Sequence, residues 1–398
     1  MVTSVRLPLV LLAASAAGLG TLAAAQPAAV AHPAGAARWR MAAIVTNCRN
    51  DTMSSVVATG PRDAWAVGDP DAGSPSCRTD LEHWNGTAWR RIPVPRGVVD
   101  GSVGSFSEPI AATSASDAWI FPAVPTHIGL SFFTYNDALR WNGSGWQKSV
   151  FPVKLIVSTA VAFSPSNAWA FGGYVRRGNQ GRPYAARYDG RSWHRAPMPG
   201  APLDVAAASS RDMWAVGPTL PTFRSPLSRK VIVAMHWDGR SWRTVRVPFS
   251  VPFGKRYELF RSAAAADPGG FWWAYVAGPP AGSGETTGLL HWDGTRWQAI
   301  TIPLIARDFS QMVPDGHGGV WLTADGGTIR HPAEYAYHYG YGRWTRQVVP
   351  TPRGFNETMF GMAWIPHTRS VWAVGEADRD HLKGHENGNV GVIARYGP

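Results

Sequence analysis

A fixed spacing of aromatic residues recurs along this chain and constrains its fold more than any other sequence feature. Six times an aromatic residue is followed five positions later by Trp, and five of these copies contain Asn-Gly or Asp-Gly. Asn-Gly and Asp-Gly between short apolar runs indicate a tight hairpin turn, because both residues tolerate positive φ. The pattern predicts six β-hairpins, from Trp84 to Trp89, Trp141 to Trp146, Tyr188 to Trp193, Trp237 to Trp242, Trp292 to Trp297 and Tyr339 to Trp344.

A second Trp recurs in short runs of β-forming residues that follow a turn cluster, as in DAWAVG. Stretches of small residues such as Ala263–Ala266 precede some of these runs and predict a further strand near a crowded axis. Each unit then holds four short strands and repeats at about 50 residues, which is typical of a β-propeller blade. We predict an all-β fold, a seven-bladed β-propeller of four-stranded blades. The recurring residues are Trp65, Trp119, Trp169, Trp214, the pair Trp272 and Trp273, Trp321 and Trp372.

The last unit lacks its fourth strand, because the chain ends at Pro398, two residues after Tyr396, where a hairpin Trp should follow. Near the other end of the chain, Arg38–Met41 reads RWRM and resembles the outer strand of the other units. We therefore predict that this N-terminal strand completes the last blade and closes the ring. Closure removes the exposed sheet edges that otherwise favour aggregation.

The third unit resembles a kelch-type repeat, as in the galactose oxidase and kelch propeller group. The resemblance rests on Gly172 and Gly173 in AFGGY, on ARYDG, and on Trp193 in SWHRAPMP. It implies a propeller fold but no particular activity, because propellers host many unrelated functions. A copper radical oxidase of that group would need a cysteine free to crosslink to a tyrosine, and we find no such set of residues.

The first 31 residues are interpreted as a signal peptide and short linker, and residues 32–398 as the propeller. Arg6 precedes an apolar run from Leu7 to Ala25, and cleavage near position 25 or 31 fits the small residues there. We expect a secreted, extracellular, monomeric protein with no membrane anchor after cleavage. In an oxidising compartment Cys48 and Cys77 are expected to form a disulfide. The Ala content and the excess of Arg over Lys favour a bacterial source.

The net charge of +11 indicates anionic partners. The hairpins have constant length, whereas the distance from the second-strand Trp to the third-strand aromatic varies, from 18 residues after Trp321 to 24 after Trp372. Because variable loops on a rigid scaffold often carry function, we place the ligand on the face where these loops open. Arg and aromatic side chains suit anionic or sugar-like ligands, although solvated loops would have the same composition. The predicted ligand-binding residues are Arg176, Arg177, Arg182, Phe223, Arg224, Lys255, Arg256 and Tyr257.

The remaining polar residues favour binding over catalysis, without deciding whether the chain is an enzyme. The sequence has no Gly-x-Ser-x-Gly elbow and no His-Glu-x-x-His, and no cofactor is expected. His83 and Arg140 occupy one repeat position and are interpreted as structural. His381 and His385 lie among three acids in one long loop, but their spacing matches no common metal site.

We predict a secreted binding or interaction propeller whose ligand is an anionic or sugar-like envelope or extracellular polymer. An anionic polysaccharide, a cell-wall polymer or a protein could be the partner, and there is no specific nucleic-acid motif. One alternative is a polysaccharide lyase or hydrolase that acts at the mouth of the central channel. The other is a structural envelope protein.

Overall fold

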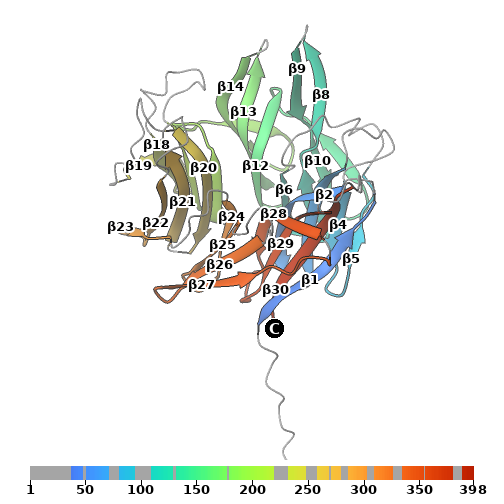
Figure 1. Cartoon of the computed structure of the whole chain (residues 1–398). Helices are drawn as coiled ribbons and strands as arrows, with labels where there is room; N and C mark the ends of the chain where they lie inside the picture. The colour runs from blue at the N-terminus through green and yellow to red at the C-terminus, as the bar shows by residue number, and fades with distance from the viewer. Residues whose placement is uncertain are drawn as a thin grey trace, which may run out of the picture. The chain divides into compact units, whose positions relative to one another are not determined.

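The computed structural model describes residues 37–47, 51–70, 80–94, 109–128, 131–176, 179–218, 232–247, 258–268, 270–278, 286–302, 309–325, 334–353, 355–379 and 388–398. These residues form seven antiparallel sheets, and they contain no helix that could cross a membrane. The segment Ala37–Pro398 is one unit, a seven-bladed β-propeller in which the sheets surround a common axis (Figure 1). The predicted fold class is confirmed.

Each blade contains four strands, which we describe from the axis outward and from blade 1 to blade 7. The inner strands are β2 (Asp51–Gly60), β6 (Ile110–Ser114), β12 (Leu155–Ser164), β16 (Asp204–Ser209), β20 (Glu258–Asp267), β24 (Phe309–Pro314) and β28 (Phe355–Trp364). The second strands are β3 (Asp63–Pro70), β7 (Asp117–Ile120), β13 (Asn167–Arg176), β17 (Asp212–Pro218), β21 (Gly270–Gly278), β25 (Val320–Asp325) and β29 (Val371–Arg379). The third strands are β4 (Asp80–Trp84), β10 (Ala138–Trp141), β14 (Asn179–Tyr188), β18 (Ile232–Trp237), β22 (Thr286–Trp292), β26 (Glu334–Gly340) and β30 (Val390–Gly397). The outer strands are β5 (Trp89–Arg91), β11 (Trp146–Ser149), β15 (Trp193–Ala196), β19 (Trp242–Val245), β23 (Trp297–Ile300), β27 (Arg343–Val348) and β1 (Arg38–Val45).

The N-terminal strand β1 completes blade 7. It pairs antiparallel with β30, with Trp39 opposite Tyr396 and Arg38 opposite Gly397. Figure 1 shows β1 beside β30 and the C-terminus close to the start of β1. The predicted closure of the ring is confirmed.

The buried side chains of the described residues form seven hydrophobic clusters, one at each junction between consecutive blades. At the junction of blades 3 and 4, Trp169 lies 5.0 Å from Trp237 between ring centroids, and 6.4 Å from Trp242. The second-strand Trp of one blade thus packs on the hairpin aromatics of the next blade. The arrangement recurs with Trp119, Trp214, Trp272, Trp321 and Trp372.

The hairpins between the third and outer strands differ from the expectation in one respect. Of each Asn-Gly or Asp-Gly pair only the Gly has positive φ, for example 96° at Gly86. The Asn or Asp instead caps the turn with its side chain, since Asn85 Oδ1 accepts hydrogen bonds from the backbone N–H groups of Thr87 and Ala88, both at 3.0 Å. Such Asx turns explain why Asn and Asp are interchangeable at this position.

One loop contains strands that the sequence did not indicate. Between β7 and β10 of blade 2, β8 (Ala123–Ile128) and β9 (Ser131–Asn136) form a hairpin. Asn136 pairs with Leu155 of β12, so this hairpin extends the sheet of blade 3 to six strands. The buried Asn136 side chain holds the contact, because its Oδ1 accepts a hydrogen bond from the backbone N–H of Val157 at 2.8 Å.

Close packing near the axis requires glycine in several second strands. The inner strands β2, β12 and β28 each have a register shift opposite such a glycine. At Gly172 a Cβ atom would lie 1.8 Å from the carbonyl oxygen of Ile156, and at Gly217 it would lie 1.7 Å from that of Ala201. These glycines are therefore needed for close approach of two strands rather than for a turn.

Candidate functional site

Most of the predicted site residues lie outside the described part of the chain. Arg176 and Arg182 belong to the paired strands β13 and β14, with Arg182 opposite Tyr174, so the structure places their backbones in one hairpin. Outside the described residues are Arg177, Phe223, Arg224, Lys255, Arg256, Tyr257, His381, His385, Cys48 and Cys77. Their predicted roles stay predictions. Within the described ranges no group of three His, Cys, Asp or Glu could hold a metal ion.

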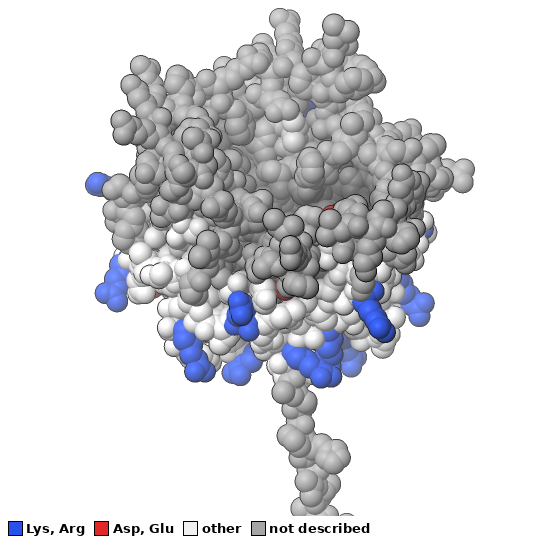
Figure 2. Space-filling view, viewed as in Figure 1, with Lys and Arg blue, Asp and Glu red and all other residues white. Residues whose placement is uncertain are grey.

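The outer strands carry charge of one sign only. Their seven segments contain Arg38, Arg40, Arg90, Arg91, Lys148, Arg195, Arg243, Arg343 and Arg346, and no Asp or Glu. All of these cationic side chains are exposed, and Figure 2 shows Lys and Arg around the lower half of the molecule. Charged residues on outer strands, Lys in particular, also protect sheet edges from pairing. The outer strands therefore present positive charge alone.

Few of these cations are neutralised nearby. Lys148 Nζ lies 2.5 Å from Asp137 Oδ2, and Arg243 Nη2 lies 3.1 Å from Asp238 Oδ2. Arg91 Nη2 lies 3.4 Å from Asp80 Oδ1. Arg38, Arg90 and Arg343, on the neighbouring blades 7, 1 and 6, have no ion pair with a described residue. A flexible polyanion could contact all three blades in succession.

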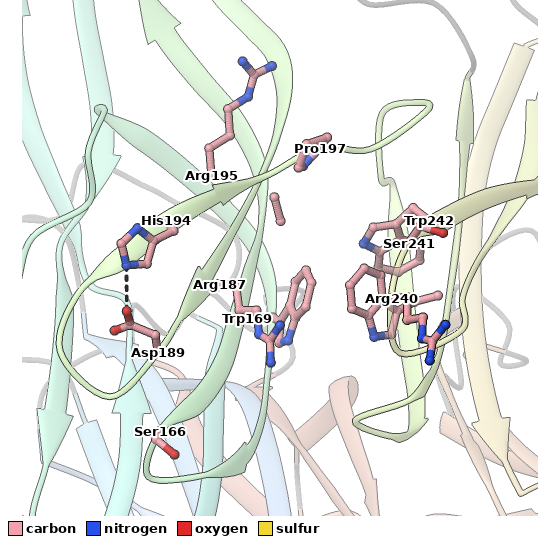
Figure 3. A pocket seen from close by; sticks show the side chains of 12 residues that line it. Ser166, Trp169, Arg187, Asp189, His194, Arg195, Pro197, Arg240, Ser241 and Trp242 are labelled. Atoms are coloured by element: carbon pink, nitrogen blue, oxygen red, sulfur yellow. Dashed lines mark hydrogen bonds and ion pairs between the residues drawn. The ribbon is translucent and has the colours of Figure 1, made fainter.

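A cavity of about 620 Å³ opens at the junction of blades 3 and 4, and we call it the blade 3–4 groove. Its aromatic wall is Trp169, Trp237 and Trp242, all largely buried. Figure 3 shows Arg187 beside Trp169 at its centre, with Arg240 and Trp242 on the blade 4 side. The other lining residues are Ser166, Asp189, His194, Arg195, Ala196, Pro197 and Ser241.

The charge of this groove comes from a break in the repeat. In four blades an Asp lies at the start of the second strand or a few residues before it, and its carboxylate pairs with the His or Arg of the third strand. In blade 3 Asn167 replaces that acid, and its Oδ1 accepts a hydrogen bond from Arg187 Nε at 3.3 Å. Arg187 therefore has no carboxylate partner among the described residues, although its guanidinium carbon still lies 5.5 Å from the centroid of the Trp169 ring. The acid-containing pairs, at 2.7–2.9 Å, are Asp63–His83, Asp117–Arg140, Asp212–His236 and Asp315–His338.

These pairs confirm that His83 and Arg140 are structural, as the sequence predicted. The sequence grouped Arg187 with them, and the structure places it at the same repeat position, but there it is exposed and bonds Asn167 in place of an acid. The signal was present in the sequence, because NAWAFGG has Asn where DAWAVG, DAWIF and DMWAVG have Asp. The Asn could be interpreted only once the structure showed that Asn167 contacts Arg187, 20 positions further along.

The central channel holds a second cavity of about 590 Å³, lined by the inner strands of blades 1, 2, 3, 6 and 7. Its polar residues are neutral: Ser54, Ser55, Ser158, Thr159, Ser310 and Gln311. Two of the hydroxyl groups donate hydrogen bonds to the backbone of their own blade, Ser54 to Val67 O at 3.2 Å and Ser158 to Phe171 O at 3.1 Å. The described lining therefore offers hydroxyl groups but no acid or base.

Blade 1 contains a buried carboxyl cluster near the end of β1. Asn47 Nδ2 donates a hydrogen bond to Asp80 Oδ1 at 2.7 Å, and Arg91 Nη2 lies 3.4 Å from the same oxygen. Burial, followed by the nearby charge of Asp51, raises the pKa of Asp80 to about 7. Burial also raises the pKa of Glu82.

This cluster predicts a pH-dependent stability. Folded Asp80 keeps its proton up to about pH 7, whereas in the unfolded chain the carboxyl has its ordinary pKa of 3.8, so the free energy of unfolding falls as pH rises between these values. Asp80→Asn is expected to raise the melting temperature at pH 8 by about 3–6 °C, because an amide carries no buried charge and can still accept from Asn47. Thermal unfolding at pH 4 and pH 8 measures the effect.

Asp238→Asn is the matched control. Hydrogen bonds from the backbone N–H groups of Ser241 and Arg240 lower the pKa of Asp238, so its contribution has the opposite sign. Other hairpins carry Asn at this position, as at Asn85. We expect no gain in stability at pH 8 from this change, and an equal gain from both variants would contradict the assignment to Asp80.

Comparison with known proteins supports the fold alone. No family model and no curated protein sequence matches the chain. Solved propellers that resemble it include YCF48 bound to D1 peptide, with TM-score 0.51 and 13% identity over 91% of this chain and 95% of that one. An ulvan lyase of a polysaccharide lyase family, PL25, has TM-score 0.52 and 10% identity, covering 87% of this chain and 95% of the other.

The propeller domain of the Trilobed protease from Pyrococcus furiosus is similar at TM-score 0.51 and 11% identity, covering 84% of this chain and 91% of that one. That propeller is described as having an open velcro topology. In the present chain β1 pairs with β30, so blade 7 is built from both ends of the propeller sequence.

Proposed function

We propose that this chain is a binding propeller for an acidic polysaccharide, and that it contacts the polymer across several blades. The observation that carries the proposal is the single sign of charge on the outer strands, where every charged residue is an exposed Arg or Lys. A ring of exposed cations attracts a polyanion without requiring one fixed pocket. Arg also forms bidentate hydrogen bonds with carboxylate and sulfate groups.

The aromatic and cationic groove between blades 3 and 4 favours a saccharide over other polyanions. The apolar wall of the groove can contact a sugar ring, and acidic groups on the sugar pair with Arg. A propeller with 10% identity to this chain has been solved bound to -[GlcA(1-4)Rha3S]-, so the fold is compatible with an acidic saccharide. The ligand-binding residues predicted from the sequence, such as Arg176 in β13 and Arg182 in β14, would extend the binding surface.

The proposal includes secretion, because Arg6 and the apolar run after it have the features of a signal peptide, and the expected Cys48–Cys77 disulfide suits that compartment. Gly172 and Gly173 further favour a kelch-type repeat. The neutral hydroxyl lining described for the central channel favours binding over the alternative of lyase or hydrolase activity there.

A salt titration of binding tests the function. The purified protein is expected to bind an immobilised uronate or sulfated polysaccharide, with affinity that falls steeply as NaCl rises from 50 to 500 mM, because each contact releases counterions. A neutral glucan and duplex DNA serve as comparison ligands. Absence of binding at low salt, a response that does not depend on salt, or stronger binding to DNA would contradict the proposal.

The triple change of Arg38, Arg90 and Arg343 to Gln tests the outer strands directly. It is expected to weaken polysaccharide binding at 150 mM salt by roughly tenfold or more and to reduce the slope against log salt by about two, given a contribution of ~0.7–0.9 per contact. The same three positions changed to Lys form the matched control and should retain the slope. Arg176→Gln with Arg182→Gln tests the loop face separately.

A further inference from the structure

We propose that the blade 3–4 groove is a specific subsite for one sugar unit bearing a sulfate or carboxylate group. This inference rests on the proposed polysaccharide function but assigns a different kind of binding, since it concerns a single anionic sugar rather than a long polymer. The outer strands would supply general attraction. The groove would recognise the substituent.

The first argument is the free hydrogen-bonding capacity of Arg187. Its Nε donates to Asn167 Oδ1, which also accepts from Trp169 Nε1 at 3.2 Å. The Nη groups make no hydrogen bond with a described residue, and they can therefore donate in pairs to an oxyanion. In blade 2 the equivalent Arg140 is neutralised by Asp117, whose Oδ1 lies 2.7 Å from Arg140 Nε. Blade 3 thus differs from blade 2 at this position by one residue, the neutral Asn167 in place of Asp117.

The second argument is the charge balance of the walls. Arg240 also lines the groove and has no ion pair with a described residue. The Arg195 guanidinium instead lies 5.8 Å from the ring of Tyr184, which belongs to the cluster between blades 2 and 3. The one carboxylate in the lining, Asp189, is held by His194 Nε2 at 2.8 Å, and backbone N–H groups of Ser192 and Arg191 with that histidine lower its pKa to about 2. Figure 3 shows this pair on the blade 3 side, away from Arg240. The guanidinium groups of Arg187 and Arg240 against one occupied carboxylate leave the groove positive.

The third argument is the rigid aromatic wall. Trp169 is fixed by ring contacts with Trp237 and Trp242, and it stacks on Phe171 with an interplanar angle of 8°. A volume of about 620 Å³ is within the usual range of small-ligand sites and exceeds what a bare inorganic anion needs. The apolar wall suits a sugar ring, and the unpaired guanidinium groups suit an anionic substituent. A sugar that carries such a substituent therefore fits the groove better than a neutral sugar or a bare anion.

Asn167→Asp is the decisive variant, because it supplies the missing acid without removing any cation. Blades 1, 2 and 4 have Asp at this position, so the fold accepts it. The new carboxylate is expected to pair with Arg187 as Asp117 pairs with Arg140. Binding of glucuronate and of a monosaccharide sulfate ester, followed by Trp fluorescence or calorimetry, should weaken at least tenfold, and Arg187→Gln should have a similar effect.

Asn142→Asp is the matched control, since it adds the same charge in the blade 2 hairpin, where other blades carry Asp. It should leave monosaccharide binding within twofold of the parent. Unchanged binding in Asn167→Asp, or equal loss in both variants, would overturn the subsite. So would parent protein that binds inorganic sulfate as tightly as the sugar sulfate, or that binds neither sugar.

Binding of the long polysaccharide separates this inference from the proposed function. If the parent binds the polymer with the expected salt dependence but binds no acidic monosaccharide, the subsite is wrong and the proposed function holds. If neither ligand binds, both are wrong. Unfolding curves of the variants, expected to match the parent within about 0.5 kcal/mol, show whether a loss of binding comes from the site.

Discussion

Removal of residues 1–45 is expected to prevent stable folding, whereas removal of residues 1–36 is expected to leave the melting temperature unchanged. The difference between the two truncations is strand β1, the outer strand of blade 7. Without it, β30 becomes an unpaired edge and the cluster between blades 6 and 7 loses a Trp. An exposed hydrophobic edge of this kind also favours aggregation. Thermal unfolding and size-exclusion chromatography of both truncated chains measure the effect.

Trp39→Ala isolates the aromatic part of this contribution. Trp39 is 6% exposed and lies 5.9 Å from Trp321 and 5.7 Å from Tyr396 between ring centroids. Loss of a buried Trp typically costs about 3–5 kcal/mol, so the variant is expected to melt roughly 5–10 °C below the parent. Denaturant unfolding gives the free energy directly.

Ile44→Ala in the same strand is the control, because Ile44 is 50% exposed. Its cost should stay within about 0.5 kcal/mol. Equal losses for Trp39→Ala and Ile44→Ala, or a truncation at residue 45 that melts like the parent, would show that the propeller is stable without its N-terminal strand.

Gly217→Ala is expected to destabilise the propeller by about 3 kcal/mol or more. The added Cβ would lie 1.7 Å from the carbonyl oxygen of Ala201, which belongs to the backbone and cannot rotate away as a side chain could. The segment before β16 must move away from β17 to relieve the clash, at the cost of the hydrogen bond from Leu203 N–H to Val216 O at 2.8 Å. Gly172→Ala is expected to act in the same way in blade 3, and the two effects should add.

Gly145→Ala provides the contrast. Nothing lies within 4 Å of its added Cβ, and its φ is not in the positive range. The substitution should be neutral or stabilise by about 0.4–1 kcal/mol, because Ala restricts the unfolded chain. Denaturant unfolding of Gly217→Ala and Gly145→Ala in parallel measures both, and similar values would contradict the close approach at the axis.

The repeat pattern predicted more of the fold than of the site. Trp recurring at fixed spacing identified the strands and the hairpins, and the unpaired Tyr396 identified Trp39 as its partner. The hairpin β8–β9 was missed because its attachment to blade 3 depends on one buried side chain, Asn136, whose partner Val157 lies 21 residues further along. The turn chemistry was also misjudged, since side-chain capping by Asn85 replaces its expected positive φ.

The blade 3–4 groove shows why the sequence alone could not identify this site. Arg187 reads as one more member of a repeat position that holds Arg140 in the second blade. Only the pairing of Arg187 with Asn167 across β13 and β14, and the approach of blade 4, show that it is not neutralised by a described residue and lines a cavity. Most of the ligand-binding residues predicted from the variable loop lengths lie outside the described structure. Mutation compares these residues with those of the blade 3–4 groove.

The sequence by itself determined the number of blades, the order of strands and the closure by Trp39, because these follow from spacing along the chain and from the local preferences of Trp, Asn and Gly. The tertiary structure decided which of the repeated cations are neutralised, where the glycines are required, and where a cavity opens between blades. Those properties depend on distances between atoms far apart in sequence, and Coulombic and steric energies change steeply over a few ångströms.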